Sequence, residues 1–133
     1  MISTQSETAR LDVDPVIRRY FDSFNAGEFE TTAALFAVDG QLHAPFEEPI
    51  VGTAAISQYL QAEAAGMQAY PKVLDPVSQS DCGDRTIVRG QVQAIAFKVH
   101  VAWIFDLSEA NQIQRLQVKL LASMTDLLKL RSE

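Results

Sequence analysis

The spacing of apolar residues changes once along this chain, near Gly66, and that change constrains the fold more than any other feature. Before Gly66 apolar residues recur every three or four positions, as in amphipathic helices, whereas after it they alternate every second position, as in strands. Helices followed by a run of strands indicate an α+β domain with a mostly antiparallel sheet. A curved sheet packed on helices leaves a cone-shaped cavity, so we expect a ligand pocket.

The first helix is the most clearly marked element. It is expected to begin at Pro15 behind the capping residue Asp14, because proline fits the first helical position and aspartate accepts hydrogen bonds from the free N–H groups of the first turn. Residues 25–27 (Asn-Ala-Gly) are expected to end it. Its predicted apolar face is formed by Val16, Ile17, Tyr20, Phe21 and Phe24.

The remaining elements follow from the same patterns. Two further helices are expected, one over about 29–37 and one that begins at its cap Thr53 and ends at Ala65. Between them, a turn is expected at Asp39-Gly40 and a short strand over 41–46. After Gly66, strands are expected over about 67–79, 85–97, 98–107 and 113–122, and a short C-terminal helix over 125–131. Residues 1–12 are expected to be a flexible tail, which leaves one domain over 13–133.

Composition narrows the class of protein. Acidic residues outnumber Lys and Arg by 17 to 11, and the resulting net charge of −6 argues against non-specific binding to nucleic acid. No apolar run reaches the roughly 18 residues of a membrane span, and the polar N-terminus lacks a signal sequence, so a soluble, cytoplasmic protein is expected. The single Cys82 excludes an internal disulfide; an intermolecular disulfide or redox sensing is the alternative to an inert thiol.

Tyr20 and Trp103 are the most informative candidate site residues. Tyr20 lies on the apolar face of the first helix, and Trp103 lies within the predicted strand 98–107. Each has a large apolar body and one hydrogen-bond donor, so a pair that points into one cavity can hold the oxygen of an otherwise apolar ligand. The alternative is that both are core residues whose polar ends bond to backbone or water.

The ionisable residues give weaker signals. His43 and His100 are the only imidazoles, and neither has a cysteine or acidic cluster at metal-ligand spacing. A sequence with these features more often has structural or solvated histidines than catalytic ones. The acids Asp81, Asp84, Asp106 and Glu109 are interpreted as turn residues. No nucleotide-binding, nucleophile-elbow or zinc-protease motif occurs.

Several segments resemble one known family. The stretch IRRYFDSFNAGEFETTAALFAVDGQLHAPFEEPIVG resembles the opening of the nuclear-transport-factor-2-like (NTF2-like) superfamily of cone-shaped α+β domains. Within it, APFEEPIVG, VRGQVQ, VAWIFDL and VKLLASMTDLLKLR, in that order, are similar to the C-terminal domain of the cyanobacterial orange carotenoid protein and its free-standing homologues. The resemblance implies three N-terminal helices packed on a curved, mostly antiparallel sheet, with a short C-terminal helix.

The resemblance also implies a function. In that family a tyrosine matching Tyr20 and a tryptophan matching Trp103 donate hydrogen bonds to a ketocarotenoid carbonyl, of the echinenone, canthaxanthin or 3'-hydroxyechinenone type. Phe24, Met67, Phe105 and Val118 match residues that line the tunnel. The implied role is pigment transport without catalysis, by a homodimer that shares one pigment. The resemblance further implies delivery to a helical or N-terminal-domain-like carotenoid partner and transient contact with a membrane for uptake. It also implies quenching of singlet oxygen in photoprotection.

The sequence departs from the family pattern in places. A Pro-Trp-Phe and Gly-rich loop usually precedes the Ala-Trp strand, but here residues 94–98 read AIAFK, about four residues shorter, so a second tryptophan is absent. Lys119 matches a position at which the two-domain orange carotenoid protein tends to have an acid. Glu63 matches an acid that, in the two-domain protein, pairs across the interface between the domains.

Ketosteroid isomerase belongs to the same superfamily, but its general base and its oxyanion-hole acid match Ala44 and Ala102 here. Without these two acidic side chains the chain lacks the groups that transfer the proton, so isomerase chemistry of that kind is disfavoured. Two other functions remain open. A SnoaL-type cyclase or isomerase relative using His43 or His100 is the enzyme alternative, and a colourless dimeric interaction module is the other.

Overall fold

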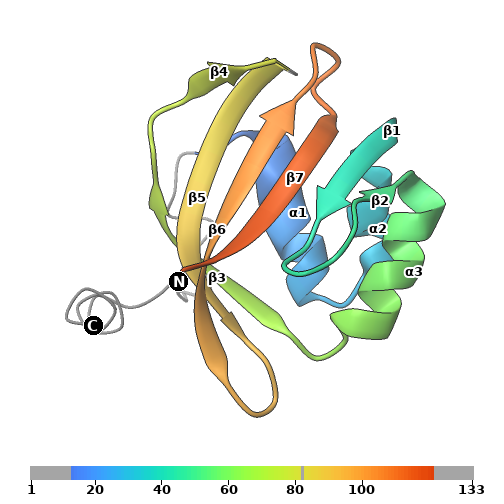
Figure 1. Cartoon of the computed structure of the whole chain (residues 1–133), viewed down its shortest axis with the longest axis vertical. Helices are drawn as coiled ribbons and strands as arrows, with labels where there is room; N and C mark the ends of the chain where they lie inside the picture. Colours follow the sequence, from blue (N-terminus) through green and yellow to red (C-terminus); the bar gives the residue numbers. More distant parts are fainter. Residues whose placement is uncertain (1–12, 82, 122–133) are drawn as a thin grey trace, which may run out of the picture.

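The computed structural model describes residues 13–81 and 83–121, which form three helices and one seven-stranded sheet. The helices are α1 (Pro15–Asn25), α2 (Phe29–Ala34) and α3 (Thr53–Glu63). The strands are β1 (Phe36–His43), β2 (Ile50–Val51), β3 (Gln68–Leu74), β4 (Ser78–Ser80), β5 (Gly83–Gln93), β6 (Lys98–Leu107) and β7 (Ile113–Leu121) (Figure 1). The predicted α+β class with helices leading a mostly antiparallel sheet is confirmed.

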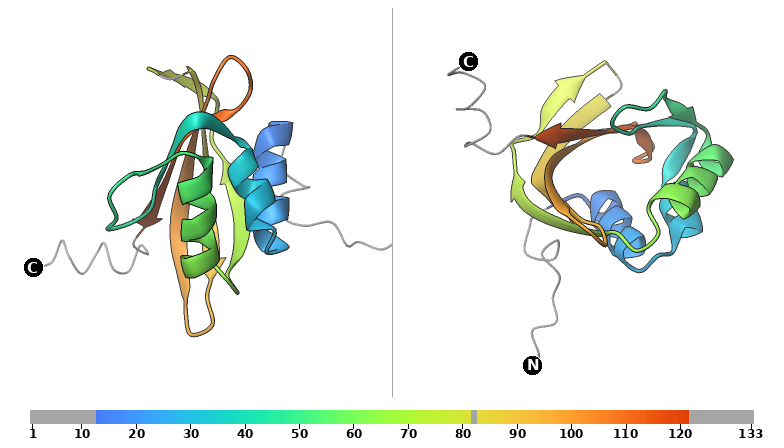
Figure 2. Two further views of the ribbon diagram at one scale, coloured as in Figure 1. Left: turned by 90° about the vertical axis from the view of Figure 1, so that its right-hand side faces the viewer. Right: turned by 60° about the horizontal axis from the view of Figure 1, so that its bottom comes forward.

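The sheet has the strand order β2-β1-β7-β6-β5-β3, with β4 paired to β5. All neighbours are antiparallel except β1 and β7, which run parallel. The long strands curve around the helices, so α1 lies against the inner face of the sheet while α3 flanks β1 (Figure 2). The core lies between α1 and the inward side chains of the central strands, among them Val101, Trp103 and Phe105 of β6.

The first helix forms as predicted. Asp14 Oδ1 accepts a hydrogen bond from Val16 N at 2.9 Å, and Pro15 occupies the first turn. The face predicted to be apolar is buried, with Ile17 and Phe21 fully enclosed. The other two helices differ at their ends: α2 stops at Ala34, before the predicted end, and α3 is capped by Gly52 rather than by Thr53, which is already helical.

The turn predicted at Asp39-Gly40 is wrong. β1 runs through both residues and pairs with β7, with a shift in register between Phe36 and Gln41. A Cβ on Gly40 would lie 2.8 Å from the carbonyl oxygen of Ile113. The glycine therefore permits close approach of the β1 and β7 backbones, which is a second use of glycine that local sequence does not distinguish from a turn.

Two predicted strands are divided or shortened. The segment 67–79 forms β3 and the short β4 in place of one strand, and 85–97 ends at Gln93. Residues 94–97 form the hairpin turn between β5 and β6, where Ala94 N donates to Phe97 O at 2.8 Å. The predicted tail 1–12, Cys82 and the predicted helix 125–131 lie outside the described residues. Within the described part of the chain, no helix is long and apolar enough to span a bilayer.

Candidate functional site

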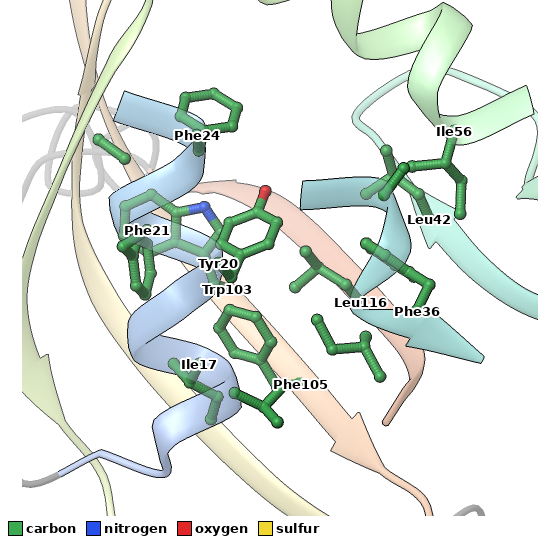
Figure 3. Packing of buried hydrophobic residues seen from close by; sticks show 14 of the residues in the cluster. Ile17, Tyr20, Phe21, Phe24, Phe36, Leu42, Ile56, Trp103, Phe105 and Leu116 are labelled. Carbon is green, nitrogen blue, oxygen red and sulfur yellow. The ribbon is translucent and has the colours of Figure 1, made fainter. Parts of the chain in front are cut away.

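Tyr20 and Trp103 lie in one aromatic cluster between α1 and β6 (Figure 3). The Tyr20 ring meets Phe105 edge-on, with centroids 5.3 Å apart. The Trp103 ring meets Phe21 edge-on at 4.8 Å, and Phe21 in turn contacts Tyr20 at 5.3 Å. Two segments 83 positions apart in sequence therefore meet through Phe21 and Phe105, because α1 packs directly on the inner face of the sheet.

The polar atoms of this pair are buried. Tyr20 is 3% exposed and Trp103 is 2% exposed. Among the residues that the structure describes, neither the Tyr20 hydroxyl nor the Trp103 indole N–H has a hydrogen-bond partner. Burial alone raises the pKa of Tyr20 far above its usual value, so the phenol stays protonated and remains a donor. Buried donors are nearly always paired in proteins, so two unpaired ones in one cluster indicate a missing acceptor.

The other predicted lining residues surround this pair. Phe24 stacks on Tyr20, with centroids 5.9 Å apart and planes 23° apart, and Phe105 is fully buried beside it. Val118 on β7 is the direct cross-strand neighbour of Trp103. Met67 and Val118 are partly buried against the same core. The structure thus places all six predicted residues in or against one cluster.

Asn25 fixes the end of α1 next to β3. Its side chain donates to Ala69 O at 2.9 Å and accepts from Ala69 N at 2.7 Å. This two-way bond satisfies the backbone of Ala69 near the start of β3, and it holds the end of α1 beside that strand. Sequence patterns placed Asn25 only as part of a helix stop.

A pocket opens at the end of β1 and β7. Its volume is about 470 Å³, and it is lined by His43, Ala44, Pro45, Phe46, Glu47, Gln117, Val118, Lys119 and Leu120. The lining includes Val118 but neither Tyr20 nor Trp103. The opening at His43 and Val118 therefore lies one strand away from Trp103, on its β7 side, while packed aromatic side chains contact the two rings.

The two histidines occupy different surroundings. The His43 ring donates from Nε2 to the Gln41 amide oxygen at 2.8 Å, and burial followed by the charge of Arg115 lowers the pKa of His43. His43 also lines the pocket together with Glu47. His100 is exposed on the outer face of the sheet, because its side chain and that of Trp103 point to opposite faces of β6.

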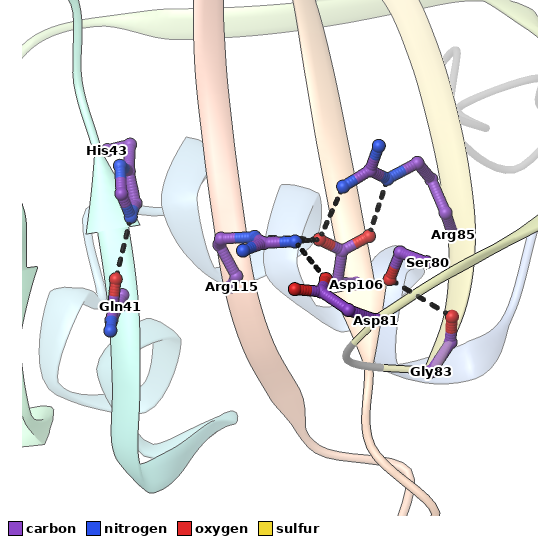
Figure 4. A network of polar contacts seen from close by, with 8 residues as sticks. All are labelled: Gln41, His43, Ser80, Asp81, Gly83, Arg85, Asp106 and Arg115. Carbon is purple, nitrogen blue, oxygen red and sulfur yellow. Dashed lines mark hydrogen bonds and ion pairs between the residues drawn. The ribbon is translucent and has the colours of Figure 1, made fainter.

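The outer face carries a charge network that sequence reasoning missed (Figure 4). Asp106, predicted to lie in a turn, lies within β6 and is fully buried between its cross-strand neighbours Arg85 and Arg115. Arg85 donates to it at 2.7 and 3.0 Å, and Arg115 donates to it at 2.8 Å and to Asp81 at 3.0 Å. Burial opposes ionisation, but the hydrogen bonds and charges of both arginines outweigh it and lower the pKa of Asp106. Only the strand register could have shown this network.

Across residues 13–81 and 83–121, no group of three or more His, Cys, Asp or Glu side chains is arranged to hold a metal ion. The polar groups of the aromatic cluster are the Tyr20 hydroxyl and the Trp103 indole N–H, each of which can donate to an oxygen atom.

Comparison with known protein families identifies the family to which this chain belongs. A family model described as a SnoaL-like domain matches residues 17–116, which include most of α1, both aromatic positions and most of the sheet. The chain belongs to the SnoaL-like domain family. This SnoaL-like domain shares its fold, at a TM-score of 0.65 and 22% identity, with a putative polyketide cyclase from Sinorhizobium meliloti.

Individual relatives are more informative than the family model. The domain is 32% identical over 120 residues to the orange carotenoid-binding protein of Limnospira maxima, and 32% identical over 118 residues to that of Synechocystis sp.. These matches cover 86% and 84% of this chain but 37% of each relative, in the C-terminal domain region. The chain thus spans little more than a third of these relatives, and the predicted relationship is confirmed.

Solved structures agree with the sequence matches. The orange carotenoid protein of Anabaena (Nostoc) sp., in a structure binding canthaxanthin, matches with a TM-score of 0.77 and 30% identity over 88% of this chain and 38% of that one. The Fremyella diplosiphon protein matches with a TM-score of 0.76 and 28% identity over 96% of this chain and 43% of that one.

Proposed function

We propose that this SnoaL-like domain binds a ketocarotenoid without catalysing a reaction, and that Tyr20 and Trp103 donate hydrogen bonds to its carbonyl oxygen. The observation that carries the proposal is the pair of buried donors that have no acceptor among the described residues. A ligand whose polar group is a single carbonyl on an apolar body supplies the acceptor that each donor lacks. The similarity to orange carotenoid-binding proteins makes echinenone, canthaxanthin or 3'-hydroxyechinenone the ligand type to test.

Burial of the pigment supplies most of the affinity in this proposal. If one end of the elongated pigment buries on the order of 300–400 Å² of apolar surface in the domain, burial contributes roughly 8–10 kcal/mol to the binding free energy before entropic costs. Two hydrogen bonds add about 1 kcal/mol each. The two donors therefore set the orientation and the absorption of the pigment more than its affinity.

The ligand reaches the donors by parting the side chains between the pocket and Trp103. Val118 lies on this route, because it lines the pocket and is also the cross-strand neighbour of Trp103. Phe24, Met67 and Phe105 then enclose the bound ring end. This opening is a minor state of the empty protein that the ligand makes dominant.

A pigment longer than the domain leaves half of its length outside. A second copy covers that half at the lowest cost, which gives a homodimer around one pigment. The role of such a dimer is to carry the pigment, deliver it to a helical carotenoid-binding partner and quench singlet oxygen in photoprotection. Native mass measurement of the pigmented protein tests the assembly, and a monomer that holds a whole carotenoid contradicts it.

Production in a ketocarotenoid-making host tests the function itself. The full chain is expected to purify with one bound pigment per dimer, and extraction followed by chromatography identifies it. Tyr70→Phe is the matched control, because Tyr70 lies on the outer face of the sheet, beneath Lys72. Colourless protein from a host that makes the pigment abundantly contradicts the proposal.

One observation favours an enzyme as the second candidate. His43 and Glu47 line the same pocket, and Ala44 lies between them in the chain. Such an enzyme would use the imidazole as a base. Replacing His43 and His100 by alanine together separates the two functions: a carotenoid carrier retains its pigment at wild-type occupancy, whereas an enzyme loses turnover of its polyketide-like or steroid-like substrate.

A further inference from the structure

The connection between β1 and β2 contains a residue whose backbone and side chain are both in costly environments. Phe46 has a φ of 65°, in the left-handed region. In the described residues the other non-glycine residue with positive φ is Asn111, and asparagine tolerates this conformation far better than a bulky residue does. The Phe46 ring is also 95% exposed. A strained backbone that presents an apolar ring to water indicates a functional constraint at this position.

The strain follows from the type of turn. Glu47 N donates to Ala44 O at 3.3 Å, so residues 44–47 form a β-turn with Pro45 and Phe46 at its two central positions. Proline holds φ negative at the first central position, so a positive φ at the second makes this a type II turn, in which that position favours glycine. We call residues 44–47 the Phe46 turn. Glycine would form this turn at lower cost, which indicates that the ring itself is used.

The Phe46 turn forms one wall of the pocket at the ends of β1 and β7. The pocket has a volume of about 470 Å³, and residues 43–47 and 117–120 line it. On the β7 wall, Val118 packs against the core and Leu120 is half-exposed. Figure 2 shows the connection from β1 to β2 as an open loop. Because Phe46 lines the pocket and is also almost fully exposed, its ring stands at the mouth, across from an apolar wall.

We propose that Phe46 closes this pocket over its ligand: the ring turns from water onto the bound molecule and holds it against Leu120. The inference rests on the proposed function, in which the pigment passes through this pocket and leaves part of its length outside the domain. The empty pocket offers the ring no apolar partner, so the ring lies in solvent. A conjugated chain supplies a flat apolar face, which gives the closed position a contact that the open position lacks.

The rate of pigment release tests this closure. Wild type and variants are loaded with canthaxanthin and mixed with phosphatidylcholine vesicles, which accept dissociated pigment, at vesicle concentrations that no longer affect the rate. Phe46→Gly is expected to release its pigment about tenfold faster than wild type, because the contact between ring and ligand is lost. Phe46→Leu, which restores an apolar side chain, is expected to release it at an intermediate rate.

Asn111→Gly is the matched control. It introduces glycine at the other positive φ, in the connection between β6 and β7, which does not line the pocket. Its release rate is expected to stay within about twofold of wild type, as for a surface substitution away from the site.

The stability of the empty protein separates closure from a structural role. Glycine adopts positive φ without a steric cost, so Phe46→Gly is expected to unfold in urea at the same midpoint as wild type or at a higher one. Stability and pigment retention then change in different directions. A residue needed only for the fold would lower the midpoint and speed release together, and that result would overturn the proposal.

Oxidation by hydroxyl radicals, with mass spectrometry of the peptides, reads the position of the ring in the unmodified protein. Phe46 is expected to react more slowly in the canthaxanthin-loaded protein than in the empty protein. Val77 is the internal control, because it is 62% exposed beside β4 and does not line the pocket, so its rate is expected to stay the same.

Failure of the closure and failure of the proposed function give different results. Release from Phe46→Gly at the wild-type rate, or equal oxidation of Phe46 in the empty and loaded proteins, would overturn the closure while pigment binding stands. A wild type that takes up no canthaxanthin would contradict the proposed function, and the closure with it.

Discussion

Phe21 lies edge-on against Trp103, with ring centroids 4.8 Å apart and planes at 86°. Phe21 is fully buried and also contacts Tyr20 and Phe105. It is therefore the residue that joins the two proposed donors, one from α1 and one from β6. Edge-to-face pairs of this kind are stabilising beyond the area they bury, so Phe21 fixes the orientation of the indole as well as filling the core.

Replacing Phe21 by alanine is expected to lower the free energy of unfolding by about 3–5 kcal/mol, because it removes a fully buried ring from the centre of the cluster. Urea unfolding of the pigment-free protein measures the change. Phe46→Ala is the control, and since Phe46 is 95% exposed its effect is expected to stay within about 0.5 kcal/mol. Similar losses for both variants would show that Phe21 does not organise the cluster.

Replacing Tyr20 by phenylalanine is expected to leave the pigment-free protein as stable as wild type or to stabilise it by up to about 1–2 kcal/mol. The reason is that the substitution keeps the ring and removes a buried hydroxyl that has no hydrogen-bond partner in the part of the chain that the structure describes. The same urea titration measures it. A loss of more than about 1 kcal/mol would mean that the hydroxyl is satisfied within the protein, and the argument for a missing acceptor would fail.

Replacing Asp106 by asparagine is expected to destabilise the protein by about 3–5 kcal/mol at pH 7, because it leaves Arg85 and Arg115 without their buried anion. The folded pKa of Asp106 lies below its ordinary value of 3.8, so its contribution is present above about pH 4 and is lost as the pH falls through the folded pKa. The difference between variant and wild type should therefore shrink at pH 3. A difference that is the same at pH 7 and pH 3 would contradict this assignment.

The elements with strong local signals were predictable. Asp14 and Pro15 define the start of α1, and the spacing of its apolar residues defines the face that packs on the sheet. The resemblance then assigned Tyr20 and Trp103 to one site, and the structure brings them into one cluster. Their lack of acceptors within residues 13–81 and 83–121 is a property of the packed fold and could be read only from the structure.

The features that depend on long-range register were not predictable. Asp106 looked like a turn acid, because its two arginine partners lie on neighbouring strands 21 and 9 positions away. The alternation of alanine with Ile95 and Phe97 resembles a strand, yet these residues form a hairpin turn with exposed tips. Local patterns report which residues prefer a strand, whereas pairing across the sheet decides where each strand ends.

The visible absorption spectrum of the pigmented protein tests the central claim most directly. Wild type, Tyr20→Phe/Trp103→Phe and Tyr70→Phe are produced in the same ketocarotenoid-making host and compared at equal pigment content. We expect the double variant to retain pigment but to show a displaced absorption band, because the carbonyl loses both donors, while Tyr70→Phe keeps the wild-type band. A double variant whose band coincides with that of wild type would contradict the assignment of Tyr20 and Trp103 as the residues that hold the ligand.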